Sequence, residues 1–302
     1  MRIAHISDIH LCRIFKRRNI SKLTALIKKA INHGAQHFVF TGDIFDNATE
    51  KDFNLFKQIL IRHEIYKSEK TTLIIGNHDI FGGPQTASDV INFPSKCSLI
   101  NYKEKVESFV NYFNELFEGV VRPDKNSLFP FAKEFKDIVL IGVNSIDQYS
   151  VFKNPFASNG KVDKQQRKSI DSLLSSYDQT QKVKIVMVHH HFYKNDHEAR
   201  SSESNLWTKI ENYTMKLRGK KKLLKMFNKN GVKMILHGHS HEMDQYYRNG
   251  ICFLNAGGSM EEENARMFII DAFPFDIDIT LHSVPISSQK TVYDKSIIPV
   301  AV

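Results

Sequence analysis

Leu73-Ile74-Ile75-Gly76-Asn77-His78-Asp79 is the stretch of sequence on which the rest of the chain is organised. Three apolar residues run directly into a glycine and three polar residues. An apolar run that stops at a glycine predicts a buried strand that delivers polar side chains at its carboxyl end. In open α/β sheets, that edge is where ligands bind.

The same pattern occurs four more times along the chain. Apolar runs end in the polar groups Asp8-Ile9-His10, Gly42-Asp43, His189-His190-His191 and Gly238-His239-Ser240-His241. The carboxyl ends of parallel strands meet at one edge of a sheet. We therefore interpret the five groups as parts of one site.

Helical patterns separate the first three predicted strands. Residues 20–32, with Ser21 as N-cap, and residues 52–63 both carry an apolar stripe at helical spacing. This β-α-β-α-β order predicts parallel strands with right-handed crossovers. Further strands are predicted at 137–143 and 183–188, followed by antiparallel strands at 251–254, 267–271 and 276–284 with turns at Gly257-Gly258 and Pro274. Because both halves repeat the strand-then-polar pattern, we predict an α/β fold in which two sheets lie face to face.

The domain organisation follows from where this pattern breaks. Residues 1–285 are predicted to form one catalytic domain, with insertions at about 81–133 and 192–230. The first insertion contains Gly82-Gly83-Pro84 and a helical pattern over residues 106–117. Residues 286–302 are expected to form a C-terminal strand or tail.

Composition narrows the class of protein. With 41% hydrophobic and 25% charged residues over 302 positions, the chain is an ordinary globular protein. It lacks an apolar run of the ~20 residues that span a bilayer and a recognisable signal peptide. Its three cysteines are widely spaced, which fits free thiols in a reducing compartment. We expect a cytoplasmic protein without a transmembrane segment, as a monomer or homodimer.

The chain is basic, with a formal net charge of +9. Lysine and arginine concentrate at residues 13–18 and at residues 216–225. Such runs are common on solvated helical faces, and they also attract phosphates, nucleic acids and acidic lipids. Residues 13–18 directly follow Asp8 and His10, so they are the better candidate for a rim that collects an anionic substrate.

The polar side chains at the strand ends are typical metal ligands. The candidates are Asp8, His10, Asp43, Asn77, His189, His239 and His241. Carboxylate, imidazole and amide donors without thiolate favour Mn, Fe, Zn, Co or Ni. Seven donors exceed one tetrahedral zinc site and fit two metal ions that share a carboxylate and lower the pKa of a bridging water.

His78 is the candidate catalytic residue. Beside Asn77 it would face the open side of the site, where it could bind a phosphoryl oxygen or protonate a leaving alkoxide. Asp79 would orient His78 or anchor its loop, and His190 and Asn47 are interpreted as supporting residues. The ligand among His189, His190 and His191 is expected to be His189, the first after the strand.

These blocks resemble the five signature blocks of the calcineurin-like metallophosphoesterases. The resemblance covers residues 8–241 and implies a four-layer α/β/β/α sandwich with a dinuclear centre. It implies that Asp8, His10, Asp43 and His241 hold the first metal, and that Asp43, Asn77, His189 and His239 hold the second. Gly160 and Gln165 resemble the turn of the branch with cyclic-nucleotide and glycerophosphodiester phosphodiesterases, although that branch usually has proline after its histidine pair.

The resemblance implies a hydrolase of phosphodiesters or phosphomonoesters that acts through a metal-bridging hydroxide. The expected substrate is a small-molecule or lipid-headgroup phosphate ester. Three alternatives stay open: a DNA-processing nuclease, a phospholipid-headgroup hydrolase, and a non-catalytic scaffold of the same fold. The nuclease is less favoured because aromatic and basic residues do not interleave.

Overall fold

The computed structural model describes residues 1–84, 86–193, 215–261, 263–273 and 276–285. The expected C-terminal strand or tail at 286–302 lies outside these residues. Residues 194–214, the larger part of the second predicted insertion, also lie outside the described residues.

The first sheet has five strands in the order β13-β12-β1-β2-β3. Its bounds are β1 (Arg2–Ile6), β2 (His37–Phe40), β3 (Thr71–Leu73), β12 (Asn264–Phe273) and β13 (Asp276–Pro285). Strands β1, β2 and β3 pair in parallel and are connected by α1 (Arg17–Asn32) and α2 (Glu50–Arg62). This part of the fold is the predicted β-α-β-α-β unit.

The second sheet has six strands in the order β10-β11-β9-β7-β5-β4. Its bounds are β4 (Phe131–Glu134), β5 (Ile138–Val143), β7 (Val183–Val188), β9 (Met234–His237), β10 (Met243–Arg248) and β11 (Ile251–Ala256). The four central strands are parallel, and β4 and β10 are antiparallel edges. Strands β6 (Gly160–Lys161) and β8 (Leu217–Arg218) form a small separate pair, and the helices of this half are α6 (Lys164–Ser175) and α8 (Lys220–Lys229).

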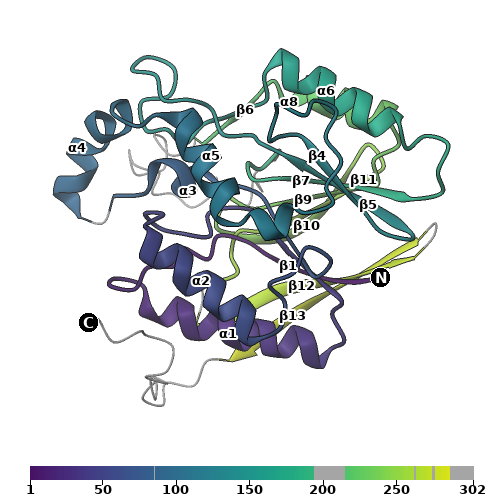
Figure 1. Cartoon of the computed structure of the whole chain (residues 1–302), viewed down its shortest axis with the longest axis horizontal. Coiled ribbons are helices and arrows are strands. Elements are labelled where there is room, and N and C mark those ends of the chain that lie inside the picture. Colours follow the sequence, from purple (N-terminus) through teal and green to yellow (C-terminus); the bar gives the residue numbers. More distant parts are fainter. Residues whose placement is uncertain (85, 194–214, 262, 274–275, 286–302) are drawn as a thin grey trace, which may run out of the picture.

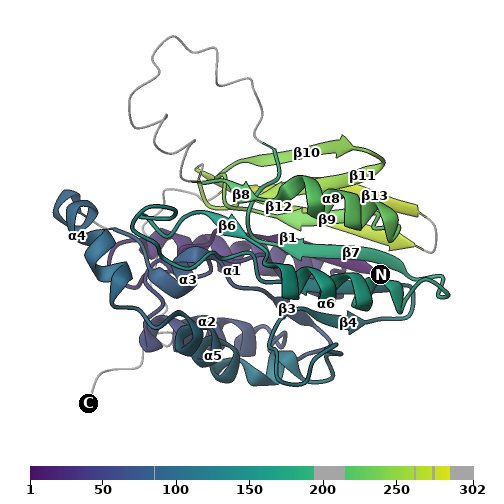
Figure 2. The same ribbon diagram turned by 90° about the horizontal axis from the view of Figure 1, so that it is seen from above.

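The two sheets pack face to face between two layers of helices (Figures 1 and 2). Apart from Lys184, β7 is apolar on both faces: Ile185 and Met187 belong to the core shared with the first sheet, whereas Val186 and Val188 pack with α6 and α8. Helices α1 and α2 lie on the outer side of the first sheet. The predicted α/β sandwich flanked by helices is therefore confirmed.

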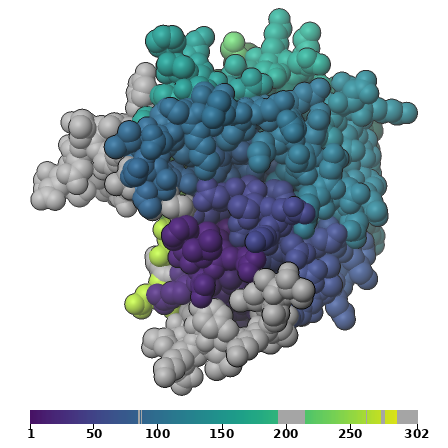
Figure 3. Space-filling view, turned by 60° about the vertical axis from the view of Figure 1, so that its left-hand side comes forward, coloured from purple at the N-terminus to yellow at the C-terminus, as the bar shows by residue number. Residues whose placement is uncertain are grey.

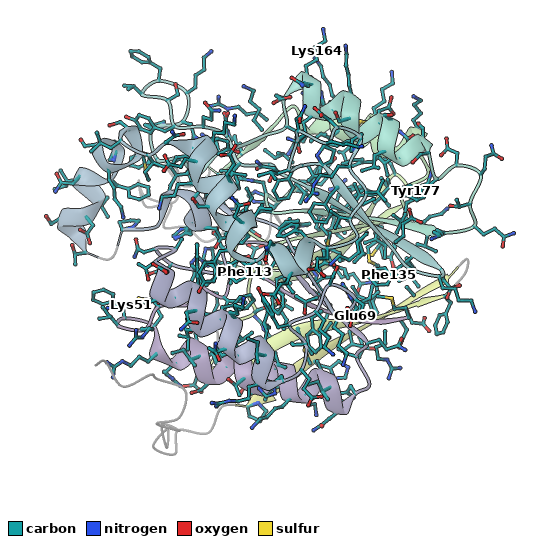
Figure 4. The ribbon with its side chains drawn as sticks, in the orientation of Figure 1. Lys51, Glu69, Phe113, Phe135, Lys164 and Tyr177 are labelled. Atoms are coloured by element: carbon teal, nitrogen blue, oxygen red, sulfur yellow. The ribbon has the colours of Figure 1, made fainter. Side chains whose placement is uncertain are left out.

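The first predicted insertion is mostly helical. Helix α3 (Asn77–Phe81) leads into it, and it contains α4 (Ala87–Ser98), α5 (Tyr102–Tyr112) and the 3-10 turn η1 (Asn114–Phe117). Phe113, labelled in Figure 4, is fully buried and stacks on Phe45 with ring centroids 6.0 Å apart. Phe53 of α2 and Phe109 of α5 join the same cluster, which fixes α5 against α2. The division into one domain with two insertions stays a prediction.

Some sequence-based boundaries are wrong. Helix α1 begins at Arg17, and Ser21 lies inside it, so Ser21 is no N-cap. Residues Gly257-Gly258 do not join a hairpin, because β11 belongs to the second sheet and β12 to the first. The short edge strands β4 and β10 were not predicted. Among the described residues, no helix combines the length and apolar character needed to cross a membrane.

Candidate metal centre

The polar groups follow strands of both sheets. Asp8 and Asp43 come after β1 and β2 of the first sheet, and His189 and His239 come after β7 and β9 of the second. The expectation of a single sheet edge is thus corrected: the carboxyl ends of two facing sheets meet. A hydrogen bond joins them, since the main-chain N–H of His239 donates to the Asp8 side-chain carboxylate at 3.0 Å.

One group of candidate ligands contains Asp8, His10 and His241. One ligand atom of each lies within 4.8 Å of the others. The Ser7 hydroxyl donates to Asp8 Oδ2 at 2.6 Å, which holds that carboxylate in place. The rings of His10 and His241 stack with centroids 5.2 Å apart.

The second group contains Asp43, His189 and His239, again within 4.8 Å. His189 Nε2 lies 3.3 Å from Asp43 Oδ2, 3.2 Å from His239 Nδ1 and 3.2 Å from Asn77 Oδ1. His189 Nδ1–H donates to the Thr41 carbonyl at 2.8 Å, so in the neutral ring Nε2 carries the lone pair and faces the site. All seven predicted ligands therefore fall into two adjacent groups.

The backbone at these residues is strained. Asp8, His10, Asp43, His239 and His241 all have positive φ, between 47° and 72°. Non-glycine residues adopt this conformation rarely and at a cost of ~1–3 kcal/mol, and such residues concentrate at functional sites. The fold accepts this strain at five of the seven candidate ligands.

Glycines allow the strand ends to approach closely. A Cβ on Gly76 would collide with the backbone and side chain of Asp43, and one on Gly238 would collide with Asp8 and Ser7. Both positions consequently require glycine for steric reasons. This explains the glycines that precede Asn77 and His239 in the sequence.

The site attracts positive charge. Burial alone would raise the pKa of Asp43, but His189 and His78 hold it well below its usual value. Burial opposes protonation of His189, yet Asp43 and Asp8 raise its pKa to about 9. A buried pair of carboxylates that stabilises a histidine cation provides the electrostatics of a cation site.

Comparisons with known proteins agree with this geometry. The model of the calcineurin-like phosphoesterase family matches residues 1–243. This chain belongs to that family. Comparison with curated protein sequences gives no match.

Solved structures of phosphatases share the fold of this calcineurin-like phosphoesterase. A dimetal phosphatase from Danio rerio aligns with a TM-score of 0.55 at 11% identity, over 92% of this chain and 98% of that chain. The purple acid phosphatase PPD1 from yellow lupin seeds aligns with a TM-score of 0.60 at 13% identity, over 94% of this chain and 51% of that chain. At such identities the likeness shows the fold alone.

The donors fit the dinuclear metal centre that this phosphoesterase family uses. Among the described residues, buried His10 Nε2 and His239 Nε2 have no hydrogen-bond partner, and His10 Nδ1 lies 3.6 Å from Asp46, beyond hydrogen-bond distance. A buried polar atom without a partner is costly, so these nitrogens are poised for a ligand. The oxygen and imidazole donors suit divalent transition metals.

The three consecutive histidines after β7 have different surroundings. His190 points away from the ligand groups: its Nε2–H donates to the Ser158 carbonyl at 3.2 Å, and Nδ1 accepts from the Ser145 hydroxyl at 2.8 Å. Both its nitrogens are used. His191 is buried and its ring stacks on that of His239 at 5.7 Å. Only His189 of the three lies in a candidate ligand group.

Asp79 and Asn47 occupy different surroundings. Asp79 accepts from the N–H groups of Gly76 at 2.7 Å and Phe45 at 3.0 Å, so it ties the loops after β3 and β2 together. Asn47 instead accepts from Lys96 Nζ of α4 at 3.2 Å. It therefore connects the loop after β2 to the insertion.

His78 lies at the open side of the groups. Its main-chain N–H donates to Asp43 Oδ1 at 2.8 Å, and 23% of its side chain is exposed. Its ring meets His10 edge-on at 4.7 Å. Nδ1–H donates to the Asp46 carbonyl at 3.3 Å, which leaves Nε2 for other contacts.

Sequence reasoning missed two carboxylates. Asp46 lies within reach of His10 and His78 and is joined by Lys16 Nζ at 3.1 Å. Its spacing of three residues after Asp43 could have drawn attention to it. Glu261 accepts from His241 Nδ1–H at 2.7 Å. It lies on the connection between β11 and β12, which crosses from one sheet to the other, and nothing in the sequence places it near His241.

Proposed function

We propose that this chain is a dinuclear metal-dependent phosphoesterase that hydrolyses phosphodiesters or phosphomonoesters. The observation that carries the proposal is the convergence of seven oxygen and nitrogen donors from both sheets into two adjacent groups. Asp8, His10 and His241 would hold one metal, His189, His239 and Asn77 the other, with Asp43 between them. When bound, the two ions would polarise the phosphoryl group and activate the attacking water.

The residues of the chain would do the remaining work. The strained and interlocked strand ends fix the donors before substrate arrives. His78, at the open side, would contact a phosphoryl oxygen or deliver a proton to the leaving oxygen. The main-chain carbonyl of Asp46 accepts from His78 Nδ1–H and would orient the His78 ring.

The test uses metal-stripped protein and two aryl substrates, bis(4-nitrophenyl) phosphate and 4-nitrophenyl phosphate. Added Mn²⁺ should restore single-turnover hydrolysis of one or both. Asp43→Asn and His189→Ala should each reduce the rate at least about 100-fold, because the first alters the ligand placed between both metals and the second removes a ligand of one metal. His33→Ala, which changes a half-buried histidine directly after α1, is the matched control and should retain activity.

Absence of metal-dependent turnover with either ester would leave the scaffold hypothesis in its place. Metal analysis then tests the scaffold hypothesis, because a scaffold that has lost metal binding would hold well under one ion per chain. The compartment, the oligomeric state and the metal in the cell remain the expectations stated from sequence.

A further inference from the structure

The most exposed large apolar side chains are concentrated in three segments. Among the described residues, seven such side chains are at least 63% exposed. Six of them lie before α1, on α4 or directly after it, or in the loop before β6: Ile14, Phe15, Ile91, Leu99, Val151 and Phe152. Soluble proteins rarely gather such side chains in one region without an interaction partner.

All three segments border the metal centre. Lys16, next to Phe15, donates to Asp46 at 3.1 Å. Lys96 of α4 donates to Asn47 at 3.2 Å. The loop that carries Phe152 reaches the neighbour of the candidate ligand His189, because the Ser158 carbonyl accepts from His190 at 3.2 Å.

The segments lie at one end of the molecule. In Figures 1 and 2, the segment before α1, helix α4 and the loop before β6 are all at the left, opposite the start of β1. Figure 3 brings this end forward and shows the purple N-terminal segment below the blue segment that includes α4. The three segments that carry the exposed apolar residues thus lie at the end of the molecule that carries the site, and we call this end the rim.

The segment of this rim before α1 is strongly basic. Between Asp8 and Asp43 the sequence has no acidic residue, and residues 13–18 contain four cations. Arg17 and Arg18 are exposed beside Ile14 and Phe15, and exposed Lys153 follows Phe152. The surface around the apolar tips therefore favours an anionic partner.

Exposed apolar side chains surrounded by lysine and arginine are complementary to the surface of an anionic bilayer. The tips enter the boundary between headgroups and acyl chains, while lysine and arginine contact lipid phosphates. A single nucleic-acid strand would also attract the cations, but it binds by stacking bases on aromatic rings. Four of the six side chains are aliphatic, and these partition into lipid but offer no stacking surface.

We propose that this end of the protein docks on an anionic lipid bilayer. The docked site faces the headgroup layer, so its substrate class is the phosphate ester of a membrane amphiphile. The assignment of substrate rests on the proposed function, whereas the docking itself does not.

Vesicle sedimentation tests the docking with the full chain. The protein should sediment with phosphatidylcholine vesicles that contain phosphatidylserine and less with pure phosphatidylcholine. Phe15→Ser/Phe152→Ser should weaken binding about 100-fold, at about tenfold for each lost apolar anchor. The matched control Ile61→Ser/Phe273→Ser changes exposed apolar residues at the end of α2 and of β12, away from the site, and should bind as the unchanged protein does.

A second pair of variants tests the contribution of the basic residues to vesicle binding. Arg17→Gln/Arg18→Gln should weaken binding about 25-fold, since one basic residue contributes about fivefold. Lys67→Gln/Lys233→Gln removes two exposed charges before β3 and β9, at the opposite end, and should have little effect. Equal losses in both charge variants would show nonspecific attraction and overturn the proposal.

Activity separates this inference from the proposed function. Phe15→Ser/Phe152→Ser should hydrolyse a soluble aryl ester at the unchanged rate, yet lose turnover of a phosphate ester presented in vesicles. Failure to bind anionic vesicles overturns the docking even where aryl esters are hydrolysed. Binding to single-stranded DNA that the Phe15→Ser/Phe152→Ser variant loses, without binding to vesicles, also overturns it in favour of nucleic acid.

Discussion

His78 is the residue at which metal binding and proton chemistry would meet. Its main chain contacts Asp43, and its ring stands between His10 and the solvent. A proton that this ring delivers to the leaving oxygen accelerates hydrolysis only of substrates whose leaving group is poor. Aryl esters leave readily as phenolates, whereas alkyl esters need a proton at the departing oxygen.

His78→Ala should therefore slow alkyl phosphate esters by about 10²–10⁴-fold and aryl esters by clearly less. Single-turnover rates over a series of leaving groups measure the difference. Metal content should be unchanged, because His78 lies in neither proposed ligand set. Equal losses for all leaving groups would count against an acid role and favour a contact with a phosphoryl oxygen.

Glu261 positions His241 through its outer nitrogen. The contact at 2.7 Å holds the proton on Nδ1 and turns Nε2 toward Asp8 and His10. Glu261→Ala should lower affinity for Mn²⁺ about 10–100-fold at the first metal position, as loss of such partners does elsewhere. Calorimetric titration measures this, with Glu263→Ala, an exposed neighbour, as control. An unchanged titration would mean that Glu261 does not orient the ligand.

At the level of residues, the sequence predicted the strand-end candidates because each one follows an apolar run directly. Asp46 was missed because it is reached through a loop that folds back on His10. Glu261 was missed because its neighbour is His241, twenty positions away and beyond a change of sheet. Contacts that a long crossover creates leave no local periodicity to detect.

Lys133 shows how one side chain can join separate elements. It projects from β4 of the second sheet and donates to three carbonyls, those of Ser68, Thr71 and Leu116, each at 2.8 Å. These acceptors lie before β3, at its start and in η1. The lysine therefore ties both sheets to the insertion. Burial lowers its pKa to about 7.

This depressed pKa makes stability depend on pH. Between about pH 7 and 10 the unfolded chain holds the Lys133 proton more tightly than the folded protein, so the contribution of Lys133 to the free energy of unfolding rises with pH, by at most ~1.4 kcal/mol per unit. The stability of the protein relative to Lys133→Met should thus increase across this window. Urea unfolding at several pH values measures it, and Lys136→Met, an exposed neighbour, should show no such trend. A constant difference would contradict the expected shift.

At the level of elements, strands and helices with strong periodicity were predictable, and their ends were not. Helix α1 extends back to Arg17 although no side chain caps it, since packing of Leu23 and Leu26 against the first sheet outweighs the local signal at Ser21. Residues Gly257-Gly258 look like a hairpin turn locally. Only the pairing of β12 with β1 sends the chain into the other sheet.

At the level of the whole molecule, the candidate centre lies across the junction of two sheets. Asp8, Asp43 and Asn77 come from the first sheet, and His189, His239 and His241 from the second. The candidate donors therefore come together only when the two sheets pack against each other. A metal ion bound here would contact both halves at once, so binding should stabilise the folded chain as a unit.

Addition of Mn²⁺ to metal-stripped protein should raise the free energy of unfolding by about 2.7 kcal/mol per site at a free concentration 100 times the dissociation constant, because the unfolded chain cannot assemble donors from two sheets. Urea unfolding with Mn²⁺ and with a chelator measures the difference. Asp43→Asn, which alters the residue placed between both metals, should lose most of it, and His33→Ala should retain it. If both variants keep the full stabilisation, the ions bind elsewhere on the chain. A stabilisation confined to proteins with an intact Asp43 would locate the metals where the two sheets meet.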